Sequence, residues 1–204
     1  MRKALLHLPD GSAIPAVPPA ALALLPGSFH PLHAGHRTLA AVVERKFGRP
    51  VHFELSRTNV DKPELPGEVW KERAAQFRGY APLWVTRAAV FEEKSVLFPG
   101  ALFVVGFDTA VRLLDAKYYA DETARDASLR AILQRGCRFA VGGRADASGV
   151  FRTWNDIHVS LSAEWRPLFE TLTEEDFRLD ISSTELRKPR GAPTASIPAP
   201  DSTG

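Results

Sequence analysis

The stretch that decides the fold is Pro26-Gly27-Ser28-Phe29-His30-Pro31-Leu32-His33-Ala34-Gly35-His36. A short apolar run at residues 21–25 precedes it and a helical pattern follows it, which is typical of a strand, a tight turn and a helix. A helix that begins near His33 offers unpaired backbone N–H groups and a partial positive charge at its start. Because residues three apart share one helix face, His33 and His36 can face the same anion. The stretch therefore predicts a phosphate-binding site.

The composition is that of one folded domain without a strong electrostatic field. The chain has 204 residues, of which 45% are hydrophobic and 25% are charged, so it can bury a core. A formal net charge of +2 does not favour nucleic acid as a partner, and anion binding must come from locally placed groups. Cys137 is the sole cysteine, which excludes an internal disulfide and fits a reducing compartment.

The N-terminal segment begins like a signal peptide, but its apolar part is short and is interrupted by His7, Pro9 and Asp10. No apolar run in the sequence approaches the length of a membrane span. We therefore expect a cytoplasmic protein without a membrane partner, and the sequence leaves a homo-oligomer open.

Hydrophobic periodicity predicts strands that alternate with helices along the chain. The expected strands are residues 21–25, 51–55, 83–86, 101–105, 138–141 and 177–181. The expected helices are residues 34–47, 66–78, 87–97, 109–114, 123–134, 163–172 and 183–188. Residues 2–8 are a candidate edge strand, and the proline-rich residues 14–20 are expected to be extended or a linker.

This alternation predicts an α/β fold, a Rossmann-like parallel sheet with right-handed crossovers and helices on both faces. We expect an N-terminal extension or edge strand at residues 1–20, the main domain at residues 21–188 and a disordered tail at residues 189–204. Ligands of such sheets lie beyond the carboxyl ends of the strands. The turn at Gly27 and the segment Gly106-Phe107-Asp108 both fall at such ends.

A second motif, near the other end of the chain, is Ile181-Ser182-Ser183-Thr184-Glu185-Leu186-Arg187. Serine hydroxyls at a helix start, together with the N–H groups that follow, can bind phosphate. Arg187 lies one turn further on and can reach the same anion with its planar guanidinium group. Taken alone, the motif is better explained as a helix cap followed by a basic residue.

Together the two motifs resemble the nucleotidyltransferase superfamily that carries a His-x-Gly-His element. The matching residues are Gly27, Phe29, Pro31, His33, Gly35 and His36 in the first motif and Ile181, Ser182, Ser183, Thr184 and Arg187 in the second. The second motif is most similar to the nicotinate and nicotinamide mononucleotide adenylyltransferases. The resemblance implies the nucleotidylyl transferase fold and transfer of AMP from ATP to a mononucleotide phosphate, with release of pyrophosphate.

The resemblance also implies roles for individual residues. His33, His36 and Arg187 would be the catalytic residues that contact the triphosphate. Further contacts to the nucleotide or its phosphates are implied for Gly27, Ser28, Phe29, Gly35, Gly106, Asp108, Ser182, Ser183 and Thr184. Asp108 is equally well explained as a cap of the helix that begins near Thr109.

The region expected to bind the acceptor departs from typical pyridine-nucleotide enzymes. Residues 53–63, 108–113 and 117–119 resemble a cytidyltransferase-like group instead. Lys62, Trp70 and Arg73 are the candidate acceptor-binding residues, although a tryptophan at helical spacing with Phe77 is more often part of a core. The glycines before Arg144 either approach the adenosine or form a surface turn.

Mg²⁺ bound mainly by the triphosphate of ATP is expected, without a metal site made of protein ligands. Three alternatives stay open: a cytidylyltransferase that uses CTP, a phosphopantetheine-type adenylyltransferase, and a nucleotide-binding domain that has lost turnover. A fragment of a class I aminoacyl-tRNA synthetase is disfavoured, because the segment from Ser182 to Arg187 is not lysine-rich.

Overall fold

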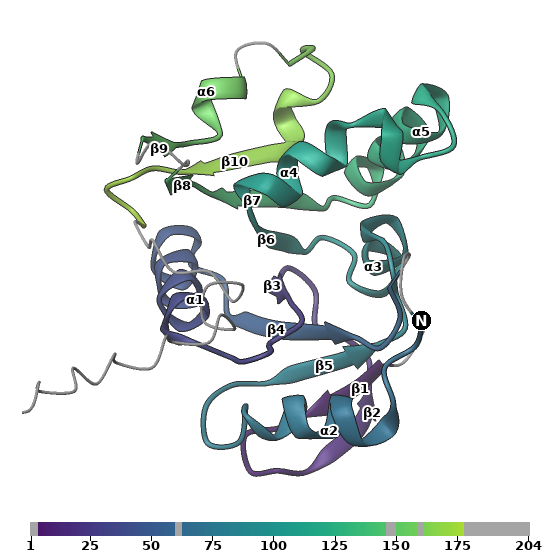
Figure 1. Cartoon of the computed structure of the whole chain (residues 1–204), viewed down its shortest axis with the longest axis vertical. Coiled ribbons are helices and arrows are strands. Elements are labelled where there is room, and N and C mark those ends of the chain that lie inside the picture. The colour runs from purple at the N-terminus through teal and green to yellow at the C-terminus, as the bar shows by residue number, and fades with distance from the viewer. Residues whose placement is uncertain (1–3, 60–62, 146–149, 159–160, 178–204) are drawn as a thin grey trace, which may run out of the picture.

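A twisted sheet of eight strands organises the molecule (Figure 1). The structure is a computed structural model, and it describes residues 4–59, 63–145, 150–158 and 161–177. The strand order is β10-β7-β6-β3-β4-β5-β1-β2. Strands β10 to β5 in this order run parallel, whereas β1 and β2 pair antiparallel with their neighbours. The strands are β1 (Ala4–His7), β2 (Ala13–Ala16), β3 (Ala23–Pro26), β4 (Val51–Ser56), β5 (Leu83–Thr86), β6 (Leu102–Gly106), β7 (Arg138–Gly142) and β10 (Phe169–Leu172).

Helices cover both faces of this sheet, and each face has its own apolar core. Helices α1 (Ala34–Phe47) and α2 (Gly67–Ala75) pack on one face. Helices α3 (Phe91–Leu97), α4 (Phe107–Leu114) and α5 (Glu122–Gln134) pack on the other. The small elements are η1 (Ala116–Tyr118), α6 (Asn155–His158), η2 (Arg166–Leu168) and the separate antiparallel pair of β8 (Arg144–Ala145) with β9 (Phe151–Arg152). The predicted Rossmann-like α/β fold is confirmed.

The chain changes direction across the sheet between β3 and β6. From β3 it continues to β4 and β5 on one side, and it then returns to add β6 and β7 on the other. In open parallel sheets, this reversal opens a crevice at the carboxyl ends of the strands, where ligands bind. The reversal lies beside the turn that follows β3, and it therefore marks the place to look for a site.

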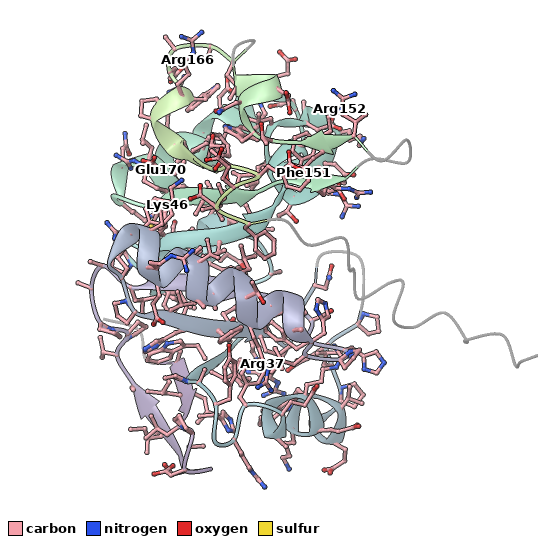
Figure 2. The ribbon with its side chains drawn as sticks, turned by 90° about the vertical axis from the view of Figure 1, so that its left-hand side faces the viewer. Arg37, Lys46, Phe151, Arg152, Arg166 and Glu170 are labelled. Carbon is pink, nitrogen blue, oxygen red and sulfur yellow. The ribbon has the colours of Figure 1, made fainter. Side chains whose placement is uncertain are left out.

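Helix α1 contacts both halves of the sheet through side chains near its two ends (Figure 2). The Arg37 guanidinium group lies 4.2 Å from the centroid of the Tyr80 ring, just before β5. At the other end, the Lys46 ammonium donates to the carbonyl oxygen of Thr171 in β10 at 3.2 Å and also pairs with the Asp176 carboxylate. The helix that begins at His33 is thus anchored to strands on either side of the reversal.

Most of the expected elements are present, with small shifts at their ends. Helix α1 and strand β5 have the predicted bounds. Helix α3 begins at Phe91 instead of residue 87, because the polar groups of the preceding loop are used elsewhere. The Thr58 hydroxyl donates to the Arg87 carbonyl oxygen at 2.6 Å, and the Glu93 carboxylate accepts from the Ala89 N–H at 2.7 Å.

One prediction about local structure needs correction. The helix expected at residues 163–172 is wrong, because Phe169–Leu172 forms strand β10 in parallel with β7 after one short turn of 3-10 helix. Pairing with a buried strand outweighs the helical tendency of the segment.

The proline-rich residues 14–20 were expected to be extended or a linker, and their first part is extended, since Ala13–Ala16 forms strand β2. This strand is the edge of the sheet, where Pro15 is tolerated, while β1 lies one position further in.

Three predictions lie outside the described residues. The strand expected at residues 177–181 falls there except for Phe177, which is buried but is not part of a strand. The helix expected at residues 183–188 and the tail at residues 189–204 fall there entirely.

The central strand should be sensitive to lost volume. Leu24 of β3 is fully buried, so Leu24→Ala should lower the free energy of unfolding by about 2–5 kcal/mol through lost burial and a residual cavity. Val111 on α4 is 39% exposed and serves as the control, since Val111→Ala should change stability by less than about 0.5 kcal/mol. Denaturant titration measures both changes, and equal effects would contradict the assigned burial.

Candidate functional site

The turn that follows β3 is shaped by the ring of Phe29 lying over Gly27. The Gly27 N–H donates to the carbonyl oxygen of Glu54 at 2.9 Å, which extends the pairing of β3 with β4 by one residue. A Cβ atom placed on Gly27 would lie 2.7 Å from two carbons of the Phe29 ring. Since this is far inside van der Waals contact, only glycine fits beneath the ring.

Phe29 is an anchor of the core. The ring is fully buried and packs edge-on against Phe53 and Phe77, with ring centroids 5.6 Å and 5.0 Å away. It also meets the His36 ring edge-on at 5.2 Å. The backbone φ of Phe29 is +43°, a left-handed conformation that is uncommon for a bulky residue. The buried ring holds the turn in this conformation, and thereby sets where His36 lies.

Two polar side chains at the C-terminal end of helix α2 hold the same turn by hydrogen bonds. The Gln76 amide oxygen accepts from the Leu32 N–H at 2.8 Å, and its amide nitrogen donates to the Phe29 carbonyl oxygen at 3.0 Å. The Arg73 guanidinium group donates to the Ser28 carbonyl oxygen at 3.0 Å. Sequence reasoning missed Gln76, because a glutamine at the end of a helix carries no signal of a contact so distant in the chain.

His33 and His36 lie together at the start of α1, as their spacing predicts. His33 is the N-cap residue, and the two ring centroids are 3.8 Å apart. The backbone N–H of His33 donates to Nδ1 of His36 at 3.3 Å. Because Nδ1 of His36 accepts a hydrogen bond, the proton of the neutral ring resides on Nε2, which is then a donor.

Both imidazoles are kept neutral near pH 7. Burial lowers the pKa of His36 to about 4, and the neighbouring His33 contributes to this shift. Burial also lowers the pKa of His33. The pair therefore offers neutral N–H hydrogen-bond donors to an anion. Because both pKa values are lowered, the two rings stay uncharged near pH 7.

Two cavities meet at the carboxyl ends of the parallel strands. The first, of about 300 Å³, is lined by His33, Gly35 and His36 on one side and by Gly106, Gly143 and Arg144 on the other. The second, of about 340 Å³, is lined by Gly27, Glu54, Ser56, Arg57, Asn59 and Lys94, among others. Pro26, Phe91 and Thr109 line both cavities, so the two adjoin at the reversal of the sheet, and together they are called the crevice below.

Gly106 lines the first cavity, and Asp108 reaches its lining residue Arg144. Gly106 ends β6 and is the N-cap of α4, so the helix begins at Phe107, two residues earlier than predicted. The Asp108 carboxylate, in the first turn of that helix, pairs with the Arg144 guanidinium group of β8. This ion pair joins the start of α4 to β8.

The remaining candidates fall in other places. Trp70, on α2, is buried in the core, where its ring meets the His7 ring edge-on and lies 5.3 Å from the Arg57 guanidinium group. That position is the core alternative raised by its helical spacing with Phe77. Lys62 and the second motif, which includes Ser182, Ser183, Thr184 and Arg187, lie outside the described residues.

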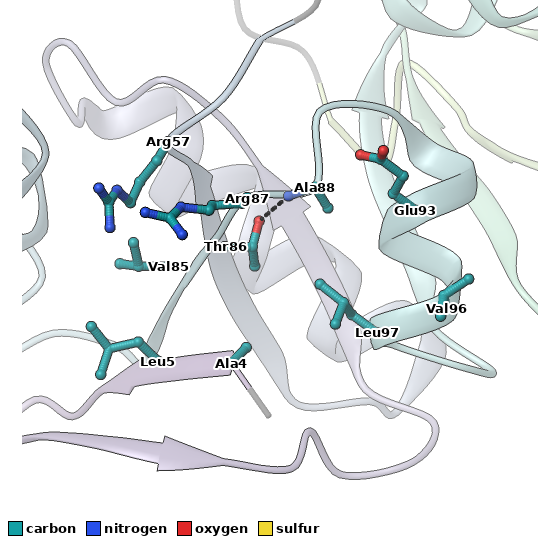
Figure 3. Close-up of a pocket in the computed structure, with 10 residues that line it drawn as sticks. All are labelled: Ala4, Leu5, Arg57, Val85, Thr86, Arg87, Ala88, Glu93, Val96 and Leu97. Atoms are coloured by element: carbon teal, nitrogen blue, oxygen red, sulfur yellow. Dashed lines mark hydrogen bonds between the residues drawn. The ribbon is translucent and has the colours of Figure 1, made fainter. Parts of the chain in front are cut away.

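A larger cavity of about 690 Å³ lies next to the crevice, on the far side of the loop between β5 and α3 (Figure 3). Leu5, Val85 and Leu97 give it an apolar floor, and Arg57 and Arg87 approach from one side. Both arginines pair with the carboxylate of Glu64, at 2.6 Å and 3.2 Å. The two arginines share this single carboxylate, so one positive charge remains beside the cavity. None of the residues that line this cavity belongs to the histidine pair.

The carboxylates near the crevice are engaged in ion pairs. Within the part of the chain that the structure describes, no group of three or more His, Cys, Asp or Glu side chains is placed to hold a metal ion. Asp108 pairs with Arg144, and Glu54 pairs with Lys94. The same described residues include no helix that is long and apolar enough to cross a bilayer.

Comparison with known proteins agrees with this geometry. Residues 24–189 match the family model described as cytidylyltransferase-like. The chain belongs to the cytidylyltransferase-like family. This membership confirms the resemblance to the nucleotidyltransferase superfamily that the two motifs predict, and it covers both motifs.

One curated relative of this cytidylyltransferase-like chain comes from Schizosaccharomyces pombe and is named "Putative nicotinamide mononucleotide adenylyltransferase". The two are 29% identical over 113 residues. The aligned stretch covers 48% of this chain and 44% of the relative, so less than half of that protein is matched.

The contact between Gly27 and Phe29 predicts a strong effect of one methyl group. Gly27→Ala should lower the free energy of unfolding by about 1–3 kcal/mol, because the buried ring must move or leave its site. Gly67 is the matched control, since a Cβ there meets no described atom within 4 Å. Thermal unfolding of Gly67→Ala should match that of the wild type, and a similar loss in both variants would argue against the contact.

The lowered pKa of His36 predicts a dependence of stability on pH. The folded protein holds this pKa at about 4, below the ordinary value of 6.5, so the unfolded chain binds more protons between these values. The free energy of unfolding should therefore fall as the pH drops from about 6.5 to about 4. His36→Asn should show a shallower fall in this window, and an NMR titration of the His36 ring gives the pKa directly. A His36 ring that titrates near 6.5 would contradict the prediction.

Proposed function

We propose that this chain transfers AMP from ATP to the phosphate of a mononucleotide, with nicotinamide or nicotinate mononucleotide as the acceptor, and releases pyrophosphate. The observation that carries the proposal is the neutral histidine pair at the start of α1, beside a crevice with two adjoining compartments. A two-substrate reaction needs two such compartments. Support for the acceptor comes from the second motif and from the name of the matched relative.

The residues act by alignment and by stabilising charge. The acceptor phosphate is largely ionised near neutral pH, since its second pKa is about 6, so the reaction needs no strong general base. The enzyme must hold the acceptor oxygen, the α-phosphorus and the leaving pyrophosphate in line. Nε2 of His36 donates to an oxygen that gains negative charge in the transition state, and His33 and the helix start act beside it.

The other residues implied by the two motifs complete the phosphate site. Gly27, Ser28 and Phe29 present backbone groups to the nucleotide, and Gly35 leaves room for it against the helix. Ser182, Ser183, Thr184 and Arg187 hold the β- and γ-phosphates. Gly106 and Asp108 contact the nucleotide from the opposite wall. Arg73 serves the site through its bond to Ser28, and Lys62 is the candidate that binds the acceptor directly.

In this proposal Mg²⁺ would enter the site as a complex with ATP. The ion neutralises charge on the phosphates when it is bound. Its ligands are mainly phosphate oxygens and water, which agrees with the paired carboxylates at the crevice.

A second candidate keeps the site and changes the donor. The matched family is described as cytidylyltransferase-like, which favours a test of CTP with a phosphorylated alcohol. Purified protein should be given ATP or CTP with Mg²⁺ and a panel of acceptors, and pyrophosphate release should be measured. Release with ATP and a pyridine mononucleotide is the expected result. Pyrophosphate release with CTP but not with ATP would show that CTP is the nucleotide donor. Nucleotide binding without any pyrophosphate release would indicate a domain that has lost turnover.

The role of His36 gives a quantitative prediction. His36→Ala should lower kcat by about a hundredfold, equivalent to about 3 kcal/mol, as expected when one donor to a developing charge is removed. His30 lies on the same turn with an exposed side chain, so His30→Ala is the control and should retain its kcat. Steady-state pyrophosphate release measures both variants, and an unchanged kcat for His36→Ala would reject the assigned role.

A further inference from the structure

A buried ion pair faces the second cavity, and the proposed chemistry at the histidines does not use it. Glu54 on β4 is fully buried, and its Oε2 accepts from the Lys94 ammonium of α3 at 2.7 Å. Its other oxygen, Oε1, accepts from the Thr86 hydroxyl at 2.5 Å. Lys94 is only 5% exposed and also donates to the Ala88 carbonyl oxygen at 2.8 Å. Four segments of the chain thus meet at one buried carboxylate and one buried ammonium group.

The protein contacts in this network leave part of the hydrogen-bonding capacity of both side chains unused. An ammonium group has three N–H donors, and the contacts to Glu54 and Ala88 use two of them. A carboxylate offers about four lone-pair sites, and the contacts to Lys94 and Thr86 use two. Glu54 and Lys94 both line the 340 Å³ cavity. The cavity wall therefore presents a hydrogen-bond acceptor and a donor side by side, 2.7 Å apart.

The wall around this pair carries several uncharged polar groups and one remaining positive charge. Lys94 is neutralised by Glu54, whereas Arg57 shares the single carboxylate of Glu64 with Arg87. The hydroxyl-bearing residues Ser56, Thr58 and Thr109 line the same cavity. Directly at the neutral ion pair, a group with several hydroxyls would find a hydrogen-bond acceptor and a donor. The remaining charge at the arginines suits a phosphate on another part of the same ligand.

Stability alone does not explain why a charged pair occupies this place. A buried ion pair pays a large desolvation penalty, and apolar residues of similar volume often replace such pairs without loss of stability. Removal of one partner is different, because it leaves a single buried charge. The pair is consequently better explained by what it presents to the cavity than by what it adds to the fold.

We propose that Glu54 and Lys94 recognise the vicinal hydroxyls of the acceptor sugar, so that the second cavity selects a ribose-bearing phosphate over its 2-deoxy counterpart. One hydroxyl donates to the Glu54 carboxylate and the other accepts from the Lys94 ammonium. The inference rests on the proposed function, in which this cavity holds the acceptor. It adds the part of the acceptor that is recognised and the residues that recognise it.

Equilibrium binding to the full chain tests this recognition without turnover. Calorimetric titration with ribose 5-phosphate and with 2-deoxyribose 5-phosphate should give an affinity at least tenfold higher for the ribose compound. A site built to bond a hydroxyl discriminates strongly against an analogue that lacks it, because its buried polar groups are then left without partners. Equal affinities, or the failure of both compounds to bind, would overturn the inference.

Variants separate recognition from support of the fold. The double variant E54Q/K94M replaces both charges together, so it avoids a lone buried charge, and its preference for ribose should fall to within about twofold. S95A is the matched control, because Ser95 is a fully buried neighbour of Lys94 on α3 that is not among the residues lining this cavity and whose hydroxyl donates to the Glu92 carbonyl oxygen at 2.6 Å. S95A should unfold at a lower temperature but keep the preference. A preference retained in E54Q/K94M, or lost equally in S95A, would assign the pair a structural role.

The same measurements distinguish this inference from the proposed function. If the protein binds ribose 5-phosphate more tightly than its 2-deoxy counterpart but releases no pyrophosphate with any donor, the proposed reaction is contradicted and the sugar recognition is supported. If pyrophosphate release is equally fast with ribose and 2′-deoxyribose acceptors, the proposed reaction is supported and the sugar recognition is contradicted.

Discussion

The contact between the Phe29 ring and the bare backbone of Gly27 is the constraint on which the site depends. The ring is fixed in the core by Phe53 and Phe77, and the Gly27 N–H is fixed by β4. Between these two attachments the chain has one route into α1, and that route brings His36 against the edge of the same ring. A side chain on Gly27 would displace the ring, and the histidine pair would lose its position relative to the strand ends. The packing of the Phe29 ring in the apolar core thus determines the position of the histidine pair.

Physical rules with short range account for the part of the fold that the sequence predicts. The helical spacing from Leu39 to Phe47 and the glycine that follows define α1, and a continuous apolar run defines β6, so both are found close to their expected bounds. The segment that forms β10 has no local pattern that predicts a strand. Phe169 and Leu172 face the core only because β7 lies alongside, and a strand defined by its partner resembles a helix when its sequence is considered alone.

The same distinction applies to the site. Gly27, His33 and His36 were predictable because they lie within ten residues and have a spacing that only a turn and a helix start explain. Gln76, Glu54 and Lys94 were not predictable, because each acts through contacts with distant parts of the chain. A glutamine at a helix end, a glutamate in a strand and a lysine in a short helix are ordinary on their own. Burial gives them their roles, and burial is a property of the fold.

The reversal of the sheet between β3 and β6 has a consequence for how specificity is divided. The compartment beside the histidines has its far wall on β6, β8 and the turn at Gly143 between β7 and β8, whereas the other compartment is built from β4, α3 and the loops after β4 and β5. Only Pro26, Phe91 and Thr109 belong to both among the lining residues that the structure describes. In the proposed reaction, each compartment holds one of the two partners. Most substitutions in one compartment would then alter the binding of one partner and leave the residues that contact the other unchanged.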